Sequence, residues 1–399
     1  MTLATTLDGD VAQRLNRLTP IVESLRVQDP SAERERVLQY AAVDELRDAG
    51  ILTLRVPQRY GGPGGSIRDV LTAVIRIASG SSNVAQALRA HFGFSERLLS
   101  NRATEVERAE WFPRINAGLL VGNAITDARG RAPGSSDTTV LPDRDGVLRL
   151  NGHKFYSTGT LYADAIAVSA VDIDGNDVQV IVPTGRTGVE RFDDWDGFGQ
   201  RTTASGATRF TDVEVTPVEV TTVSDGAHLG HSTTFLQLYL AAVAAGIAAA
   251  VRADAVDYVR NRARPAAHSV ASRAADDPFV LHAVGEIGAS AAAAETLVLS
   301  AADVLDALVD SGAQSDDDAL GEAAAVVAGA QLVAERLTLQ AAQRLFDTGG
   351  ASATARILNL DRHWRNARTV ASHNPLDYKA HAVGNHLVNG TTAPANGYF

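Results

Sequence analysis

The chain has 399 residues, of which 45% are hydrophobic and 21% are charged, and this is enough for two or three globular domains. A net charge of -11 argues against a general polyanion binder, so we expect no nucleic-acid partner. The chain contains no cysteine, which excludes disulfides, thiolate metal sites and a cysteine nucleophile. Difficult chemistry must therefore come from oxygen and nitrogen side chains or from a borrowed cofactor.

The first residues, MTLATTLDGDVAQRLN, lack the basic and apolar segments of a secretory signal, so we expect a cytoplasmic protein. The most apolar stretch, residues 235–251, has 17 residues, many of them alanine. It is short and weakly apolar for a bilayer span, and it favours a helix buried in a bundle. We therefore expect no membrane association.

Three regions with different hydrophobic patterns follow one another along the chain. A helical N-terminal domain is predicted for residues 1–118, from apolar residues at three- and four-residue steps, with a long turn at RVPQRYGGPGG. Short alternating segments predict an antiparallel β domain for residues 119–224. Helical texture returns in residues 225–399, where alanine-rich segments predict a four-helix bundle. The four predicted helices cover residues 233–262, 279–311, 318–346 and 355–372.

The strongest polar constellation lies near the C-terminus. Arg362, Arg365 and Arg368 recur at three-residue steps on one side of a predicted helix, which Asn-Pro ends just after His373. This pattern fits a histidine presented to a cavity, and it also fits an exposed basic face with a capping histidine. A second arginine group in YVRNRARP includes Arg262 and Arg264, where arginine suits a phosphate but solvated charge is equally compatible.

Other polar residues stand at strand ends. NGHKFYSTGT combines an Asn-Gly turn with a strand that ends in hydroxyls, among them Thr158, and Asn123 follows another apolar segment. The chain has no GxGxxG, Walker or HExxH motif. His228 and His231 have one carboxylate close in sequence, Asp225, so no metal site is predicted.

The order of the three parts and several motifs resemble the acyl-CoA dehydrogenase fold. The match spans nearly the whole chain and includes NGHKFYSTG, similar to the family's NG-x-K-aromatic-x-[TS] strand, and a Gly-Gly turn before DRHWRNAR. The resemblance implies a mainly α fold with an N-terminal helical domain, a middle β-barrel and a C-terminal four-helix bundle.

Both places where this family carries its catalytic glutamate are empty. Dehydrogenation of an acyl thioester needs a carboxylate base. At one location the sequence has Asn374, and at the other there is no acidic residue between Asp225 and Asp254. The C-terminal SHNPLDYKAHAVGNHLVNG, with DDWDGFGQRTTASGATRFTDVEV and YVRNRARP, is instead similar to the flavin-dependent monooxygenase branch that includes dibenzothiophene monooxygenase.

That resemblance implies a two-component system, in which a separate NAD(P)H:flavin reductase supplies reduced FMN. The flavin reacts with O2 to form a hydroperoxide, which oxygenates a small substrate such as a sulfide, an indole or an amine. It also implies a homotetramer. An FAD-dependent acyl-CoA dehydrogenase with an unrecognised base, and a flavin-binding relative without catalysis, remain as alternatives.

The resemblance also assigns candidate residues. Asn123, Thr158 and His373 match positions around the reactive flavin edge, Trp195 could cover the ring, and Arg264, with Arg262 as competitor, matches a phosphate arginine. This sequence departs from the branch in two places, and other residues are candidates to take over the roles of the two missing side chains. The branch's active-site histidine is replaced by Ser95, with an imidazole four residues earlier at His91, and a missing arginine after Gly350 leaves Ser352 as a phosphate contact.

Overall fold

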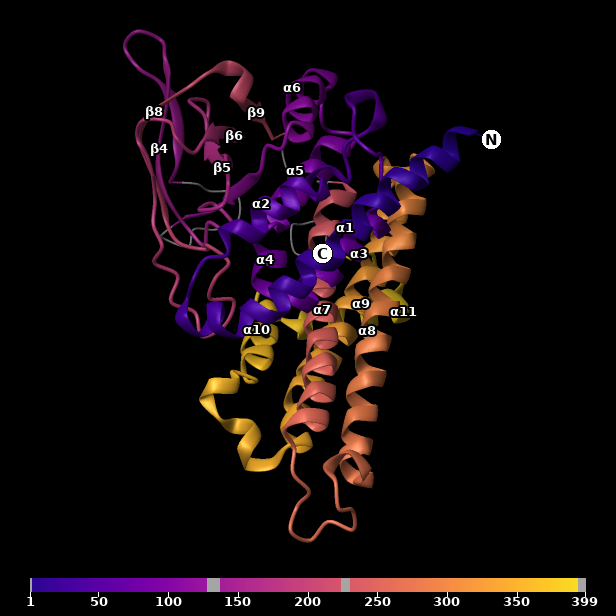
Figure 1. Cartoon of the computed structure of the whole chain (residues 1–399). Coiled ribbons are helices and arrows are strands. Elements are labelled where there is room, and N and C mark those ends of the chain that lie inside the picture. Colours follow the sequence, from indigo (N-terminus) through magenta and orange to yellow (C-terminus); the bar gives the residue numbers. More distant parts are fainter. Residues whose placement is uncertain (1, 128–136, 224–229, 394–399) are drawn as a thin grey trace.

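The computed structural model describes residues 2–127, 137–223 and 230–393. Figure 1 shows the strands set to one side of the long helices. The N-terminal helices are α1 (Thr2–Glu35), α2 (Tyr40–Asp48), α3 (Ile67–Gly80), α4 (Ser82–Ala87), α5 (Arg89–Leu99) and α6 (Glu105–Asn116). The strands are β1 (Val121–Ala124), β2 (Thr126–Asp127), β3 (Thr139–Pro142), β4 (Leu148–Phe155), β5 (Ala165–Val171), β6 (Asp177–Pro183), β7 (Val189–Arg191), β8 (Thr208–Val215) and β9 (Val220–Thr222). The C-terminal helices are α7 (His231–Asn261), α8 (Pro278–Asp310), α9 (Asp317–Arg344), α10 (Arg362–Val370) and α11 (Leu376–Asn389). The expected boundary between residues 224 and 225 lies outside the described residues.

Helix α7 forms the centre of the helical core. It packs against α3, α8 and α9, and its side chains are buried from Leu238 to Ala248 without interruption. By length and composition alone α7 could cross a membrane, but 89% of its most apolar window is buried inside the protein. Its apolar character is therefore explained by its position among the other helices.

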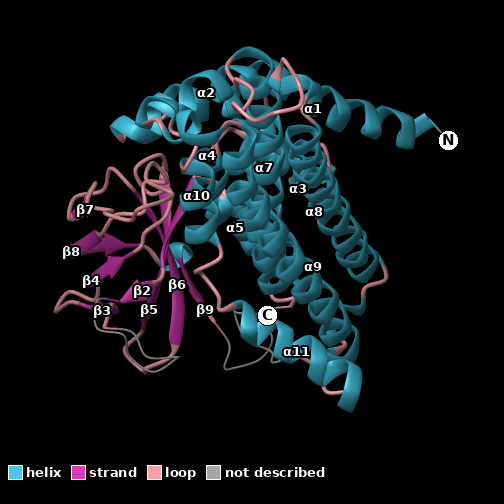
Figure 2. Ribbon diagram, turned by 90° about the horizontal axis from the view of Figure 1, so that it is seen from below, coloured by secondary structure: helices cyan, strands magenta, loops and turns pink. Residues whose placement is uncertain are grey.

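The strands form one mixed sheet, which Figure 2 shows beside the helices. The hydrogen-bonded order is β7-β8-β4-β3-β5-β6-β9, with β1 on β5 and β2 on β4. We expected an antiparallel domain, but β1 and β3 both pair with β5 in parallel. Within the described residues β7 and β9 are not paired with each other, so the sheet is open where a closed barrel was expected. Alternation of apolar residues gives it a core of its own, around Leu150, Ile166 and Val180.

The last predicted helix, residues 355–372, is shorter than expected. Residues Arg356–Leu358 form a 3-10 turn, and Asn359 adopts a left-handed conformation with φ of 50°. A left-handed residue cannot continue an α-helix, so α10 begins only at Arg362. The chain then turns at Asn374 and Pro375 and continues as α11, which packs against α9.

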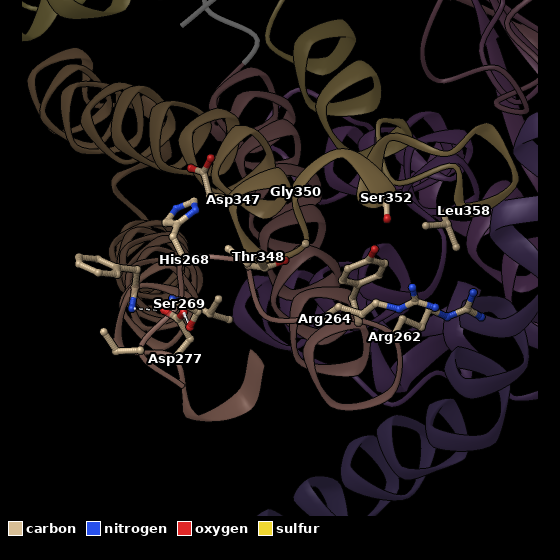
Figure 3. A pocket seen from close by; sticks show the side chains of 16 residues that line it. Arg262, Arg264, His268, Ser269, Asp277, Asp347, Thr348, Gly350, Ser352 and Leu358 are labelled. Carbon is tan, nitrogen blue, oxygen red and sulfur yellow. Dashed lines mark hydrogen bonds between the residues drawn. The ribbon is translucent and has the colours of Figure 1, made fainter. Parts of the chain in front are cut away.

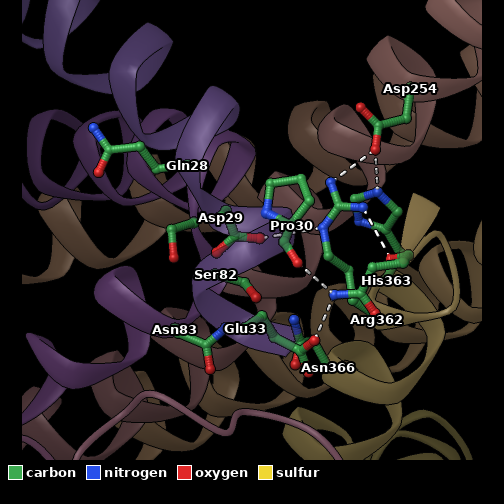
Figure 4. A network of polar contacts seen from close by, with 12 residues as sticks. Gln28, Asp29, Pro30, Glu33, Ser82, Asn83, Asp254, Arg362, His363 and Asn366 are labelled. Carbon is green, nitrogen blue, oxygen red and sulfur yellow. Dashed lines mark hydrogen bonds and ion pairs between the residues drawn. The ribbon is translucent and has the colours of Figure 1, made fainter. Parts of the chain in front are cut away.

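A buried polar network joins α1, α7 and α10 (Figure 4). The Arg362 guanidinium, with 3% of its surface exposed, contacts Asp29 Oδ2 at 3.2 Å and Asp254 Oδ2 at 2.7 Å. The His363 ring lies 2.8 Å from the same Asp254 oxygen. Burial alone would raise the pKa of Asp254, but the hydrogen bond from His363 and the charge of Arg362 hold it below its usual value. The network thereby fixes the direction of α10.

The second arginine of α10 makes a further link to α1. Arg365 forms an ion pair with the Glu33 carboxylate, whose other contact is the Asn359 side-chain amide at 2.7 Å. Arg368, in contrast, is exposed. The regular arginine spacing is therefore neither a solvated face nor a row facing a cavity, because two of the three side chains hold the N-terminal helix.

Replacing Arg362 with methionine should lower the free energy of unfolding by about 3–5 kcal/mol, since it leaves the buried Asp29 carboxylate and the half-buried Asp254 carboxylate without the arginine cation. Urea denaturation at pH 7 measures this change. The matched control is Arg368→Met on the same helix, for which we expect less than about 0.5 kcal/mol. Equal losses in the two variants would contradict a stabilising role for the network.

Candidate functional site

Helix α4 is the point at which the sheet loops and the C-terminal helices meet. All six of its residues are buried, including the polar Ser82, Asn83 and Gln86. Buried polar groups need partners, and these find them in other parts of the chain. Asn83 Oδ1 accepts from the Thr202 amide at 3.0 Å, and Ser82 Oγ accepts from the Gln200 side chain at 3.0 Å.

The same helix contacts His373, because Gln86 Nε2 lies 3.4 Å from His373 Nε2. A further hydrogen bond joins the same segment to α10, because the backbone N–H of Gln200 donates to Asn366 Oδ1 at 2.6 Å. Segment 195–205, α4 and the end of α10 therefore lie together.

Thr158 follows β4 in a turn that packs against α4. The lysine of the NGHKF motif, Lys154, is fully buried and forms an ion pair with Asp127 at 2.9 Å, which ties β4 to the segment after β1. Gly159 has φ of +78°, and a Cβ there would lie 2.3 Å from the Ala87 carbonyl oxygen. Only glycine permits both the conformation and this close approach. The Thr158 hydroxyl lies 2.9 Å from Ser205 Oγ.

Asn123 lies beside Thr158, since its backbone N–H donates to the Thr158 carbonyl at 3.4 Å. The Asn123 side-chain oxygen is buried and has no hydrogen-bond partner within the described residues, and the same holds for Gln86 Oε1 and Ser157 Oγ. A buried polar atom without a partner costs free energy. An unpaired amide oxygen such as Asn123 Oδ1 therefore fits a site whose ligand supplies an N–H or O–H donor.

His373 is the residue that the C-terminal motif singled out. Its side chain keeps accessible surface yet is closely surrounded by protein, and this desolvation, followed by the positive charge of Arg89, lowers its pKa to about 4. The ring is thus neutral at pH 7. Nδ1 lies 3.1 Å from the Val370 carbonyl, so we assign the proton to Nδ1 and leave Nε2 as an acceptor toward Gln86.

The position where a dehydrogenase would carry its base is occupied by amides. The Asn374 side chain donates to Gln237 Oε1 of α7, and Asn374 is buried. Among the described residues no carboxylate influences the pKa of His373. Within the described part of the chain, His373 and Asn374 therefore have partners that donate and accept hydrogen bonds, and none of these partners is a carboxylate.

Trp195 lies next to this group. Its indole N–H donates to the Gln200 carbonyl at 2.9 Å, and its ring meets Tyr156 edge-on with centroids 5.9 Å apart. Tyr156 is 60% exposed and precedes Thr158 by two residues. Trp195 therefore lies against the residue at the start of the Thr158 turn.

The hydrogen bonds of His91 and Ser95 go to backbone groups. His91 is fully buried, with Nε2 2.7 Å from the Leu52 carbonyl and Nδ1 accepting from the Val121 amide at 3.4 Å. Ser95 Oγ donates to the His91 carbonyl one turn earlier at 3.1 Å. Both ring nitrogens of His91 are occupied by backbone groups, so this geometry gives no support to a catalytic role. The residue instead fastens β1 to α5.

Arg262, Arg264 and Ser352 line a different pocket of about 890 Å³, shown in Figure 3. Both arginines are exposed, and the pocket is formed at the end of α7 with the Gly349–Gly350 turn. Asn374 contacts α7 at Gln237, 24 residues before the end of the helix at Asn261. At about 1.5 Å per residue this is about 36 Å, so one chain does not bring the arginines to His373.

Sequence patterns missed two residues beside His373. Gln86 and Arg89 come from the α4–α5 corner, more than 280 positions earlier in the chain, and neither belongs to a motif. The polar character of a helix as short and buried as α4 was the one available signal.

From the sequence we predict no metal site at His228 and His231. His231 Nε2 lies 2.9 Å from Glu96 Oε2, and Glu96 also pairs with Arg55, so this is a buried ion-pair cluster. His228 and Asp225 lie outside the described residues.

Known proteins resemble this chain over nearly its whole length. The acyl-CoA dehydrogenase N-terminal domain family matches residues 16–119, and the C-terminal domain family matches residues 238–378. A probable FMNH2-dependent monooxygenase, SfnC of Pseudomonas putida, is 32% identical over 98% of this chain and 94% of its own.

Two solved structures are also similar. FMN-bound TdsC from Paenibacillus sp. A11-2, a dibenzothiophene monooxygenase, has a TM-score of 0.87 and 29% identity over 97% of this chain and 100% of its own. The methanesulfinate monooxygenase MsuC from Pseudomonas fluorescens has a TM-score of 0.85 and 29% identity, covering 96% and 99%. The mainly α fold and the monooxygenase resemblance predicted from sequence are confirmed.

A structural role for His91 gives a pH-dependent prediction. Burial lowers the pKa of His91 to about 4, whereas an unfolded histidine titrates near 6.5. As the pH falls below 6.5, His91 becomes protonated in the unfolded state but stays neutral in the folded state, so the free energy of unfolding decreases until about pH 4. Between pH 6.5 and 5 the wild-type protein should lose about 1.5 kcal/mol more than His91→Gln. Urea denaturation at the two pH values measures the difference, and equal losses would contradict the burial of a neutral ring.

Proposed function

The chain belongs to the acyl-CoA dehydrogenase family, in its FMNH2-dependent monooxygenase branch, and on this premise we propose how its residues serve as the oxygenase component of a two-component system. The enzyme takes reduced FMN from a separate NAD(P)H:flavin reductase and, with O2, transfers one oxygen atom to a small substrate. Because reduced flavin is made where NAD(P)H is available, the proposal includes a cytoplasmic location.

The observation that carries the proposal is that His373 and the Thr158 turn, to which Asn123 is bonded, both pack against α4, and that among the described residues no carboxylate bonds to any of the three. The unpaired Asn123 oxygen fits an N–H of the flavin ring, and the Thr158 hydroxyl is positioned by Ser205 to bond its edge. When bound, reduced flavin supplies two electrons and activates O2. These side chains hold the ring and keep acid away from the reaction, since His373 is neutral.

The alternative, an FAD-dependent acyl-CoA dehydrogenase, requires a base that removes a proton from carbon. The amide pair Asn374–Gln237 cannot accept such a proton, and among the described residues the electrostatic influence on His373 comes from an arginine. The geometry therefore favours oxygen transfer.

The arginine pocket belongs to the same proposal through a second protomer. Since about 36 Å of helix separate it from the His373 end of α7, Arg264 and Ser352 of one chain cannot reach the phosphate of a flavin bound at that chain's own Thr158. We place them, with Arg262, at the flavin of a neighbouring protomer. This requires an oligomer, for which we propose the homotetramer expected from the family.

The function is tested by mixing the purified protein with anaerobically reduced FMN, then with O2 and a sulfide, a sulfinate, an indole or an amine. We expect oxygenated product with wild type. Thr158→Val and His373→Ala should lower the yield of product per FMNH2 by about tenfold or more and raise hydrogen peroxide, because the ring-side hydrogen bonds are lost. Ser372→Ala, next to His373 but directed at the Arg368 carbonyl, is the control that should keep wild-type yield. Reduction of a dye by an acyl-CoA, with no oxygenation of any compound, would instead establish a dehydrogenase.

The shared site is tested by complementation at limiting FMN. The pure His373→Ala and Arg264→Ala proteins should each be impaired. When the two variants are co-expressed in equal amounts, about a quarter of the sites should be active, because these sites combine the intact His373 of an Arg264→Ala chain with the intact Arg264 of a His373→Ala chain. Turnover of the mixed oligomer is compared with that of the two pure variants. An absence of recovery would place both residues at one chain's own site and refute the shared arrangement.

A further inference from the structure

The Thr158 hydroxyl is the outer member of a row of three hydroxyls that ends inside the protein. Thr158 Oγ1 lies 2.9 Å from Ser205 Oγ, which in turn lies 2.7 Å from Thr203 Oγ1. The row ends at the Gln200 carbonyl, 2.9 Å from Thr203 Oγ1. Thr158 keeps accessible surface, whereas Ser205 and Thr203 are buried, with 8% and 1% exposed. A ligand therefore reaches the hydroxyl row at its Thr158 end.

The backbone holds the hydroxyl row in place. The Ser157 N–H donates to the Gly206 carbonyl at 2.9 Å, and the Gly159 N–H donates to the Thr203 carbonyl at 3.1 Å. Ala204, which follows Thr203, adopts a left-handed conformation with φ of 53° and turns the chain before the next hydroxyl. This conformation is unfavourable for alanine and persists only where the surrounding contacts determine it. The positions of the three hydroxyls are therefore fixed by contacts on both sides.

The direction of the hydrogen bonds follows from the two ends of the row. Each hydroxyl has one proton to donate, whereas a carbonyl oxygen only accepts. The Gln200 carbonyl takes the Thr203 proton at 2.9 Å. Ser205 must then donate to Thr203, and Thr158 to Ser205. The opposite direction ends at the Tyr156 carbonyl, which is 3.4 Å from Thr158 Oγ1. It also leaves two acceptors, Thr203 Oγ1 and the Gln200 oxygen, 2.9 Å apart without a proton between them, so the first direction is favoured.

We propose that Ser205 and Thr203 are positioning residues that orient the Thr158 hydroxyl as an acceptor, and that they thereby make the site select reduced over oxidised flavin. The inference rests on the proposed function. A Thr158 proton held by Ser205 leaves lone pairs of Thr158 Oγ1 for a donor from the ligand. The flavin nitrogen N5 carries a hydrogen in the reduced ring and only a lone pair in the oxidised ring. The reduced ring therefore extends the row, whereas the oxidised ring sets two acceptors against each other.

Oxidised flavin can gain a hydrogen bond here only if the row reverses. Thr158 would then donate to the flavin, and the contact between Thr203 and the Gln200 carbonyl would lose its proton. Because Thr203 is buried, solvent does not repair that contact. The loss of one such hydrogen bond corresponds to about tenfold in affinity. The same cost favours release of the oxidised ring, which suits an enzyme that exchanges flavin with a reductase.

The inference is tested by measuring the Kd of the protein for both redox states of FMN, the oxidised state by fluorescence quenching and the reduced state by anaerobic isothermal titration. Thr203→Val removes a buried hydroxyl of similar size and leaves Ser205 free to donate to Thr158. The row then reverses, so the ratio of the Kd for oxidised FMN to the Kd for reduced FMN should fall about tenfold. This fall corresponds to a midpoint potential of bound FMN that is about 30 mV lower.

Three further variants show whether the direction of the row is responsible. Thr203→Ser keeps the hydroxyl and should keep the wild-type ratio. Ser205→Ala interrupts the row and should lower the ratio, which provides a second test if Thr203→Val does not fold. The matched control is Thr202→Val, at a neighbouring buried threonine whose hydroxyl has no hydrogen-bond partner within the described residues, and it should leave both Kd values unchanged. A merely structural role of the row would weaken the binding of both redox states equally.

The outcomes separate this inference from the proposed function. If wild type oxygenates a sulfide with reduced FMN, but Thr203→Val and Ser205→Ala keep the wild-type Kd ratio, the inference is overturned and the monooxygenase proposal stands. Tighter binding of oxidised than of reduced FMN by wild type would also overturn the inference. If reduced FMN supports no oxygenation of any compound, but Thr203→Val lowers the Kd ratio, the proposed function fails and the selection of reduced flavin stands.

Discussion

The rest of the site depends on the need to satisfy the polar side chains of a buried six-residue helix. Helix α4 lies between the sheet and the bundle, where water cannot pair Ser82, Asn83 and Gln86. Their partners are consequently drawn from loops of the middle domain and from the end of α10. These bonds set the position of His373 relative to the Thr158 turn, and the Gly159–Ala87 approach fixes the same interface by steric contact.

The electrostatics of the site follow from what is missing there. A dehydrogenase of this fold has a carboxylate, whereas here Asn374 and Gln237 form a neutral pair. Desolvation and Arg89 keep His373 uncharged, so the site combines hydrogen-bonding capacity with low acidity. That combination suits chemistry in which protons must be withheld from activated oxygen.

Helix length imposes the remaining constraint. Because α7 is a continuous 31-residue rod, its two ends cannot contribute to one small cofactor in the same chain. The arginines at its C-terminal end are useful to a flavin only if another protomer brings its own Thr158 face to them. The proposed oligomer is thus a consequence of the cofactor's size compared with the length of the helix.

The sequence alone determined the order of helical, strand-rich and helical parts, because apolar periodicity is a short-range property, and its resemblance to the monooxygenase branch proposed Asn123, Thr158 and His373 as site residues. It also identified the absent base. Only the tertiary structure decided that His91 is a core residue, that Arg362 and Arg365 hold α1, and that Gln86 and Arg89 lie beside His373. Those roles depend on contacts between segments far apart in the chain, and a pattern along the sequence records neither a side chain's burial nor its partner.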